Sequence, residues 1–148
     1  MSCIVTRISA RAYCHATEDC NKVARAVSVV MPGPISTETM RGYHGNEIKL
    51  LSSEVEGCQA YDLFLKILKN LDYIELSIFK NSLNIFKNKI YMRFNKQKAF
   101  MGVLRFDTGD DVVIVEVRVP KNHFNAFIDL LNREYERARN IETKEQRR

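Results

Sequence analysis

Basic and aromatic side chains alternate along one short segment, KIYMRFNKQKAF, which spans residues 89–100. Lysine and arginine bind phosphates with little sequence preference, and aromatic rings stack on unpaired bases. In a strand that begins at Lys89, Tyr91 and Arg93 point to the same side, because successive residues alternate between the two faces. This spacing fits a surface that binds a nucleic acid. It equally fits a core hairpin with one solvated side, and the segment alone leaves both interpretations open.

The segment CIVTRISARAYCH, at residues 3–15, repeats this combination of side chains. Its alternation predicts one long strand with Arg7, Arg11 and Tyr13 on one face. The other face is small and apolar, which suits helices packed on it. We expect the residues at the turn of the 89–100 hairpin to be exposed, either as polar turn residues or as further contacts to a backbone. The candidate nucleic-acid-binding residues are Arg7, Arg11, Tyr13, Lys89, Tyr91, Arg93, Lys96, Gln97 and Lys98.

The distribution of charge along the sequence also favours a binding surface around residues 89–100. The formal net charge is +5 and the isoelectric point is about 9.1. Residues 73–106 hold seven Lys or Arg against one acidic residue, so the basic excess lies around the predicted hairpin. A local excess of this kind is typical of a protein that binds a polyanion. The alternative is an ordinary solvated surface of helix faces and strand edges.

No arrangement of residues predicts catalysis. The sequence has no Walker loop, no G-x-G-x-x-G, no H-E-x-x-H and no G-x-S-x-G motif. His44 lies in a predicted turn and His123 in the first turn of a predicted helix, where structural roles are usual. Asp107, Asp110 and Asp111 cluster in a turn, where acidic residues commonly solvate the chain. We therefore predict no catalytic residue, no metal site and no cofactor.

The four cysteines are Cys3, Cys14, Cys20 and Cys58, and no two of them have C-x-x-C spacing. We predict that all four are free thiols in a reducing compartment. A zinc site of Cys14, His15 and Cys20 is the alternative. It is disfavoured because Cys14 and His15 point to opposite faces of the predicted strand.

The sequence has no apolar run near the length of about 18 residues that a transmembrane helix needs. The N-terminal segment alternates and carries two arginines, which is unlike a signal peptide. We expect a cytoplasmic protein without a membrane contact.

Hydrophobic periodicity predicts the elements in chain order. They are a strand at 3–15, a helix at 16–31, strands at 35–41 and 47–53, helices at 58–72 and 73–83, strands at 89–95, 98–106 and 110–119, and a helix at 121–140. The order β-α-β-β-α-α-β-β-β-α predicts one α+β domain at 1–140, with a mixed or antiparallel sheet and helices on one face. The charged tail at 141–148 is expected to fray.

The segment YMRFNKQKAFMG, followed by DDVVIVEVRV, resembles the signature of an archaeal RNA-binding-domain family labelled a predicted exosome subunit. The matching positions are Arg93, Asn95, Lys96, Gln97, Ala99 and Gly102. The family has an aspartate where this chain has Asn95, which removes any role that needs the charge. The segment YHGNEI at 43–48 also resembles a family segment, with Glu47 in place of a proline.

The resemblance implies a fold similar to the ribosomal protein that binds the small rRNA of the large subunit, with a curved sheet and helices on one side. It makes a non-catalytic RNA-binding module, accessory to exosome-type RNA processing or to ribosomal RNA, our leading hypothesis. The expected partners are RNA, an RNA-processing protein complex and a second copy of the chain in a homo-oligomer. A protein-interaction subunit without direct RNA contact is the second hypothesis. An enzyme acting on a nucleotide or on RNA is the third.

Overall fold

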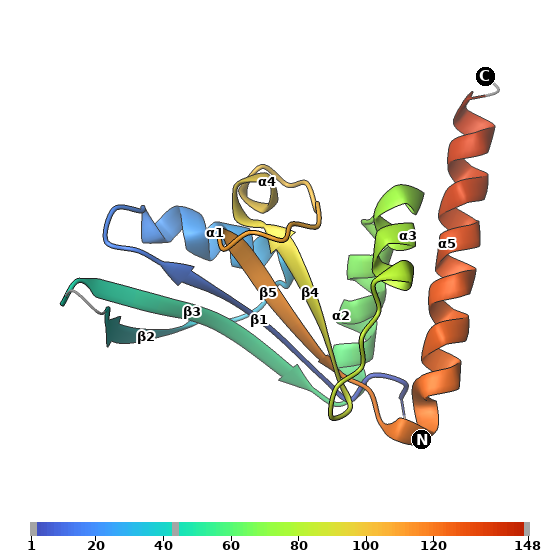
Figure 1. The fold of residues 1–148 in the computed structure, drawn as a ribbon, viewed down its shortest axis with the longest axis horizontal. Helices are drawn as coiled ribbons and strands as arrows, with labels where there is room; N and C mark the ends of the chain where they lie inside the picture. Colours follow the sequence, from blue (N-terminus) through green and yellow to red (C-terminus); the bar gives the residue numbers. More distant parts are fainter. Residues whose placement is uncertain (1–2, 43–44, 147–148) are drawn as a thin grey trace. The chain divides into compact units, whose positions relative to one another are not determined.

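The chain adopts the α+β fold class that its sequence predicts (Figure 1). The computed structural model describes residues 3–42 and 45–146, with side chains described as far as residue 143. The elements are β1 (Arg7–Cys14), α1 (Cys20–Val30), β2 (Ser36–Arg41), β3 (Glu47–Glu56), α2 (Cys58–Lys69), α3 (Tyr73–Asn81), β4 (Lys89–Asn95), α4 (Lys96–Phe100), β5 (Val112–Arg118), η1 (Lys121–His123) and α5 (Phe124–Gln146).

The five strands form an open antiparallel sheet in the order β2-β3-β1-β5-β4. Strands β2 and β3 form an antiparallel hairpin, in which Ser36 lies opposite Ser52 and Arg41 lies opposite Glu47. Strand β1 buries Ile8, Ala10, Ala12 and Cys14. This alternation confirms the predicted register of the strand, because a slip of one residue would bury the arginines instead.

Two compact units share the chain, and β1, β3, β4 and β5 contribute residues to both. The helical unit comprises the N-terminal residues through Ile8, Glu56–Tyr91 and the residues from Val117 onward. The sheet unit comprises Ser9–Val55 and Met92–Glu116.

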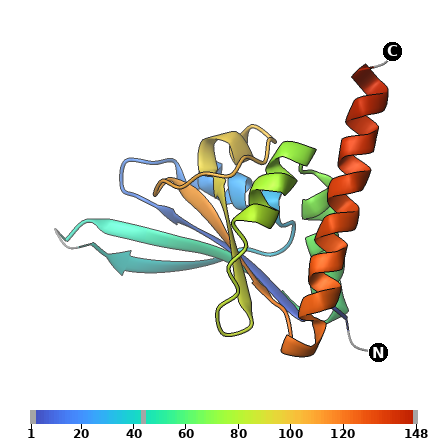
Figure 2. The same ribbon diagram turned by 45° about the vertical axis from the view of Figure 1, so that its right-hand side comes forward.

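The helical unit is built on α2, α3 and α5, with α3 alongside α5 in both views (Figures 1 and 2). Helix α2 buries Ala60, Phe64, Ile67 and Leu68, the positions that the helical periodicity predicts. The ring of Phe64 stacks on that of Phe127 of α5, with 5.4 Å between the ring centroids. A disulfide between Cys3 and Cys58 ties the segment before β1 to the first turn of α2.

The sheet unit packs α1 against α4 (Figure 1). Helix α1 buries an apolar stripe of Val23, Ala26, Val27 and Val30 at helical spacing. The N-cap is Asp19, whose side chain accepts a hydrogen bond from the backbone N–H of Asn21 at 3.0 Å. The helix therefore begins at Cys20 rather than at its predicted start at residue 16, because an aspartate caps its first turn.

The predicted strand at 98–106 is wrong, because α4 and an irregular segment occupy these positions. The Oδ1 atom of Asn95 accepts a hydrogen bond from the backbone N–H of Lys98 at 2.8 Å, which caps a helix at this point. Gly102 then takes a φ of +87°, a value that suits glycine at the end of a helix. The return toward β4 is reduced to an isolated bridge between Phe94 and Phe106.

Two further boundaries and the burial of three side chains differ from the sequence prediction. Strand β1 begins at Arg7 rather than at residue 3, and Val5 is buried where the alternation places it outward. Helix α5 continues to Gln146, through most of the segment predicted to fray. In α3, Ile74 and Ile78 are 53% and 46% exposed, although the pattern assigns them to the core.

Candidate nucleic-acid interface

In the sheet unit, Arg11, Tyr13 and Arg93 project from the strands on the side opposite to the buried residues. Tyr13 is 40% exposed, Arg93 is exposed and Arg11 is half-buried. Strand β5 lies between β1 and β4, so the axes of these two strands are about 10 Å apart. On this face β5 contributes the half-buried side chains of Ile114 and Glu116. The result is a face with two cations and one accessible ring, beside one carboxylate.

In the helical unit, the other ends of the same strands carry Arg7, Lys89 and Tyr91. Tyr91 is 44% exposed, whereas Arg7 and Lys89 are half-buried. All three alternate with buried neighbours such as Ile90, as their spacing predicts. They form a smaller set of candidate contacts within this unit.

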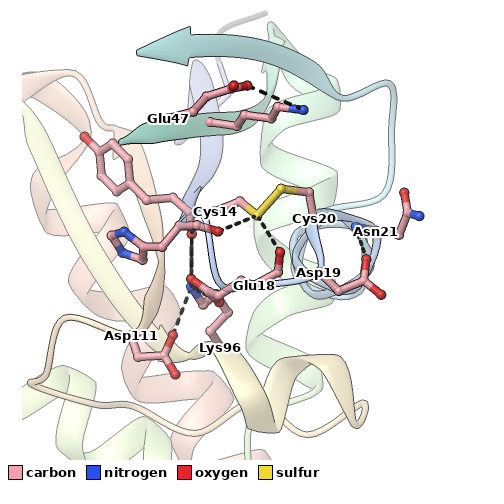
Figure 3. The surroundings of a disulfide bond; sticks show 11 residues. Cys14, Glu18, Asp19, Cys20, Asn21, Glu47, Lys96 and Asp111 are labelled. Carbon is pink, nitrogen blue, oxygen red and sulfur yellow. Dashed lines mark hydrogen bonds and ion pairs between the residues drawn. A yellow bond between two sulfur atoms is a disulfide. The ribbon is translucent and has the colours of Figure 1, made fainter. Parts of the chain in front are cut away.

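Lys96 is not at an exposed hairpin tip, and this part of the site prediction is wrong. Its side chain is 5% exposed. Its ammonium donates to the backbone oxygen of Tyr13 at 2.9 Å, lies 2.8 Å from a carboxylate oxygen of Glu18 and lies 2.9 Å from one of Asp111 (Figure 3). A lysine has three N–H donors, and these partners occupy all of them. The ammonium is therefore unavailable to a phosphate and instead joins β1, the loop before α1 and the start of β5.

Gln97 and Lys98 are exposed, but they belong to α4 rather than to a strand face. The amide of Gln97 donates to Asp111 at 3.3 Å. The ammonium of Lys98 has no hydrogen bond or ion pair among the described residues, so it remains a candidate phosphate contact. The structure thus separates these two residues from the strand-face set.

Sequence reasoning missed a pair of cations on α1. The Lys22 ammonium and the Arg25 guanidinium lie 5.8 Å and 5.4 Å from the ring centroid of Phe100. Their spacing of three residues places both on one side of the helix. A surface pocket of about 360 Å³ adjoins them and is lined by Thr17, Glu18, Asp19, Lys22, Val23, Lys96, Gln97 and Phe100. The signal was hidden because Phe100 was assigned to a strand.

Asn95 links β4 to the segment before β5. Besides capping α4, it donates from Nδ2 to Oδ2 of Asp107 at 2.8 Å. The backbone N–H of Gly109 donates to Oδ1 of Asp107 at 3.0 Å. The hydrogen bond from Gly109, followed by that from Asn95, lowers the pKa of Asp107 below its ordinary value, because each stabilises the carboxylate form.

The cysteine prediction is wrong, because the four cysteines form two disulfides, Cys3–Cys58 and Cys14–Cys20. The sulfur atoms of Cys14 and Cys20 bond to each other, which removes both from any zinc site. His44 and its neighbour Tyr43 lie outside the described residues. Among the residues that the structure describes, no helix is both long enough and apolar enough to cross a membrane.

A family model described as RNA binding matches residues 7–119. This chain belongs to that RNA-binding family. The match covers β1 to β5 in full, from the first residue of β1 to the residue after β5. The predicted resemblance to an archaeal RNA-binding family is confirmed.

Two archaeal relatives are similar over most of their length. An uncharacterised protein of Methanocaldococcus jannaschii is 32% identical over 137 residues, which cover 80% of this chain and 90% of that protein. A Pyrococcus abyssi protein named an RNA-binding protein is 30% identical over 129 residues, covering 76% of this chain and 80% of that protein.

Solved structures of archaeal proteins share the fold. A Sulfolobus solfataricus protein has a TM-score of 0.74 at 26% identity, covering 85% of this chain and 97% of its own. A Methanothermobacter thermautotrophicus protein has a TM-score of 0.71 at 23% identity, covering 88% of this chain and 98% of its own. These archaeal proteins therefore share the fold of this chain.

Replacing Asn95 with aspartate, the residue type of the family signature, is expected to lower the melting temperature at neutral pH. The variant keeps the cap on α4 but places a second carboxylate beside Asp107, where wild type has a donor. In wild type the lowered pKa of Asp107 stabilises the fold at pH values above the pKa that this carboxyl has in the unfolded chain. This stabilisation is lost as the pH falls through the pKa of Asp107 in the folded protein. In the variant, repulsion between the two carboxylates raises a carboxyl pKa instead. The difference in melting temperature between wild type and variant is therefore largest at neutral pH and disappears toward about pH 3. Thermal unfolding of both proteins across this range measures it, and a deficit independent of pH would contradict the explanation.

Proposed function

We propose that this chain is a non-catalytic RNA-binding module that holds RNA on the exposed strand face of its sheet unit. Membership of the RNA-binding family is the observation that carries the proposal. In the proposed complex, Arg11 and Arg93 bind phosphates and Tyr13 stacks on an unpaired base. Tyr91 and Lys89 offer the same two kinds of contact within the helical unit, and Arg7 adds a second cation there.

The exposed side chains support single-stranded or looped RNA as the ligand. A ring that projects from a strand can stack on a splayed base, whereas the bases of a duplex are already stacked on each other. Tyr13 and Tyr91 are 40% and 44% exposed, so each has ring surface to offer. We further propose that the module acts in the cytoplasm, as an accessory to exosome-type RNA processing or on ribosomal RNA.

Binding of labelled RNA at several salt concentrations tests the proposal. Replacing Arg93 with alanine is expected to weaken binding and to reduce the log–log salt slope by about 0.7, the amount for one phosphate of a single strand. Replacing Tyr13 with alanine is expected to cost about 1–3 kcal/mol of binding free energy with the slope nearly unchanged. Fluorescence anisotropy with a single-stranded and a duplex RNA measures both quantities.

Lys66→Ala supplies the matched control, because it removes one exposed cation from α2. It should leave the affinity and the salt slope near their wild-type values. If Arg93→Ala and Lys66→Ala change RNA binding equally, the strand face has no special role. If neither wild type nor any of the variants binds RNA, the proposed function is wrong.

A protein-interaction role is the second candidate, and the exposed isoleucines of α3 favour it. Ile74 and Ile78 are one helical turn apart and are 53% and 46% exposed. An apolar pair of this kind suits contact with a protein of an RNA-processing complex or with a second copy of the chain. Light scattering of wild type and Ile78→Lys tests self-association, which the substitution should abolish if α3 forms the contact.

A further inference from the structure

The Cys14–Cys20 disulfide joins the last residue of β1 to the first residue of α1 (Figure 3). It closes the connecting loop of residues 15–19. Within this loop, the backbone N–H of Glu18 donates to the carbonyl of His15 at 2.9 Å. The backbone N–H of His15 donates to Oε1 of Glu18 at 3.2 Å. A covalent bond and local hydrogen bonds therefore define the shape of the loop.

The same loop connects to the proposed RNA-binding face through Lys96. Glu18 lies 2.8 Å from the Lys96 ammonium, which also donates to the backbone oxygen of Tyr13 at 2.9 Å. Tyr13 directly precedes Cys14 in the chain. Its backbone is thus held by the disulfide on one side and by the Lys96 hydrogen bond on the other, while its ring remains exposed.

A surface pocket of about 240 Å³ opens at this disulfide. It is lined by Cys14, His15, Ala16, Glu18, Cys20, Glu47 and Lys49. Cys14 is 1% exposed, whereas Cys20 is half-buried, so Cys20 is the more accessible residue of the pair. The pocket wall also carries Lys49, whose ammonium lies 3.9 Å from a carboxylate oxygen of Glu47.

We propose that Cys14–Cys20 is a thiol-exchange site for a dithiol reductant, and that its reduction weakens RNA binding at Tyr13. The second part rests on the proposed function. The binding site and the exchange site share the β1–α1 connection, so one covalent change acts on both.

The exchange balances as a two-electron reduction. A thiolate of the reductant attacks Sγ of Cys20, the Cys14–Cys20 bond breaks, and Cys14 leaves as a thiolate that takes a proton. The second thiol of the reductant then attacks the mixed disulfide and releases Cys20 as a thiol. The reductant leaves as a cyclic disulfide, having supplied two electrons and two protons.

Reduction makes the loop less ordered in the protein before RNA binds. Without the covalent bond, the local hydrogen bonds and the Glu18–Lys96 ion pair still hold the loop. The end of β1 then samples more conformations, and RNA must order Tyr13 on binding. Ordering one side chain costs about 0.5–1.5 kcal/mol, which corresponds to an affinity loss of about two- to tenfold.

Two proteins in two redox states separate the effect of this disulfide from that of Cys3–Cys58. Wild type and the Cys14→Ser/Cys20→Ser variant are each titrated with a labelled single-stranded RNA, with and without dithiothreitol. Oxidised wild type should bind most tightly, and the other three samples should bind about two- to tenfold more weakly and alike. Alkylation and mass spectrometry count the free thiols in each sample, and circular dichroism confirms that each is folded.

Three results would overturn the proposal. A Cys14–Cys20 bond that stays intact in folded wild type after treatment with dithiothreitol would deny the exchange. Equal RNA affinity of oxidised and reduced wild type would deny the coupling while leaving the proposed function in place. Equal weakening of the serine variant by dithiothreitol would assign the effect to Cys3–Cys58. A failure of oxidised wild type to bind any RNA would instead reject the proposed function itself, and the coupling with it.

Discussion

Replacing Lys96 with alanine is expected to lower the free energy of unfolding by about 3 kcal/mol. The ammonium of Lys96 holds the backbone oxygen of Tyr13 and the carboxylates of Glu18 and Asp111. Removing one partner of a buried ion pair costs about 3–5 kcal/mol, because the remaining groups lose their compensation. The low end applies here because the side chain of Asp111 is 51% exposed and keeps water. Urea unfolding at neutral pH measures the loss.

Lys98→Ala is the matched control for this prediction. It removes the same charge from the same helix, but Lys98 is exposed. Its effect should stay within about 0.5 kcal/mol, as for other surface substitutions. If the two variants unfold at the same urea concentration, the Lys96 network does not stabilise the fold.

Removing the Cys3–Cys58 disulfide by a double serine substitution is expected to cost about 4 kcal/mol of unfolding free energy. A disulfide restricts the unfolded chain more when it closes a longer loop. Cys3 and Cys58 are 55 residues apart, whereas Cys14 and Cys20 are 6 apart. The same relation gives about 2 kcal/mol for Cys14–Cys20.

Denaturant unfolding of wild type and of the two double-serine variants, all without reductant, tests this order. The larger loss should belong to Cys3→Ser/Cys58→Ser. A larger loss for Cys14→Ser/Cys20→Ser would mean that contacts of the β1–α1 loop, rather than loop length, determine the stability.

The strand faces could be predicted from the sequence because their pattern is local. Alternation along β4 placed Tyr91 and Arg93 outward and Met92 inward, as the structure has them. The stripe of Val23, Ala26, Val27 and Val30 on α1 was likewise readable from its spacing. Each of these assignments depends on residues within one turn or a few strand positions.

Lys96 could not be placed in this way, because its partners are distant in the sequence. Glu18 is 78 residues away and Tyr13 is 83. A lysine beside a glutamine in a polar segment fits a hairpin turn equally well, and only the folded chain supplies the carboxylates that bury it. The cap by Asn95, which starts α4, was a local signal that the strand-like alternation outweighed.

The cysteine pairing also depends on the folded chain. The Cα atoms of a disulfide usually lie about 4.4–6.8 Å apart, and the two pairs reach 5.5 and 5.6 Å only after β1, α1 and α2 are in place. The free-thiol prediction rested on a reducing compartment. That premise does not hold generally, because intracellular proteins of hyperthermophilic archaea and bacteria are rich in disulfides.

Photocrosslinking tests the central claim, that RNA lies on the strand face of the sheet unit, most directly. A short single-stranded RNA containing thiouridine is bound to oxidised wild type, irradiated and digested, and the attached peptides are identified by mass spectrometry. The account predicts crosslinks on the peptides of β1 and β4 that contain Tyr13 and Arg93, and their loss at high salt. Crosslinks confined to α2 and α5, with none on β1 or β4, would contradict it.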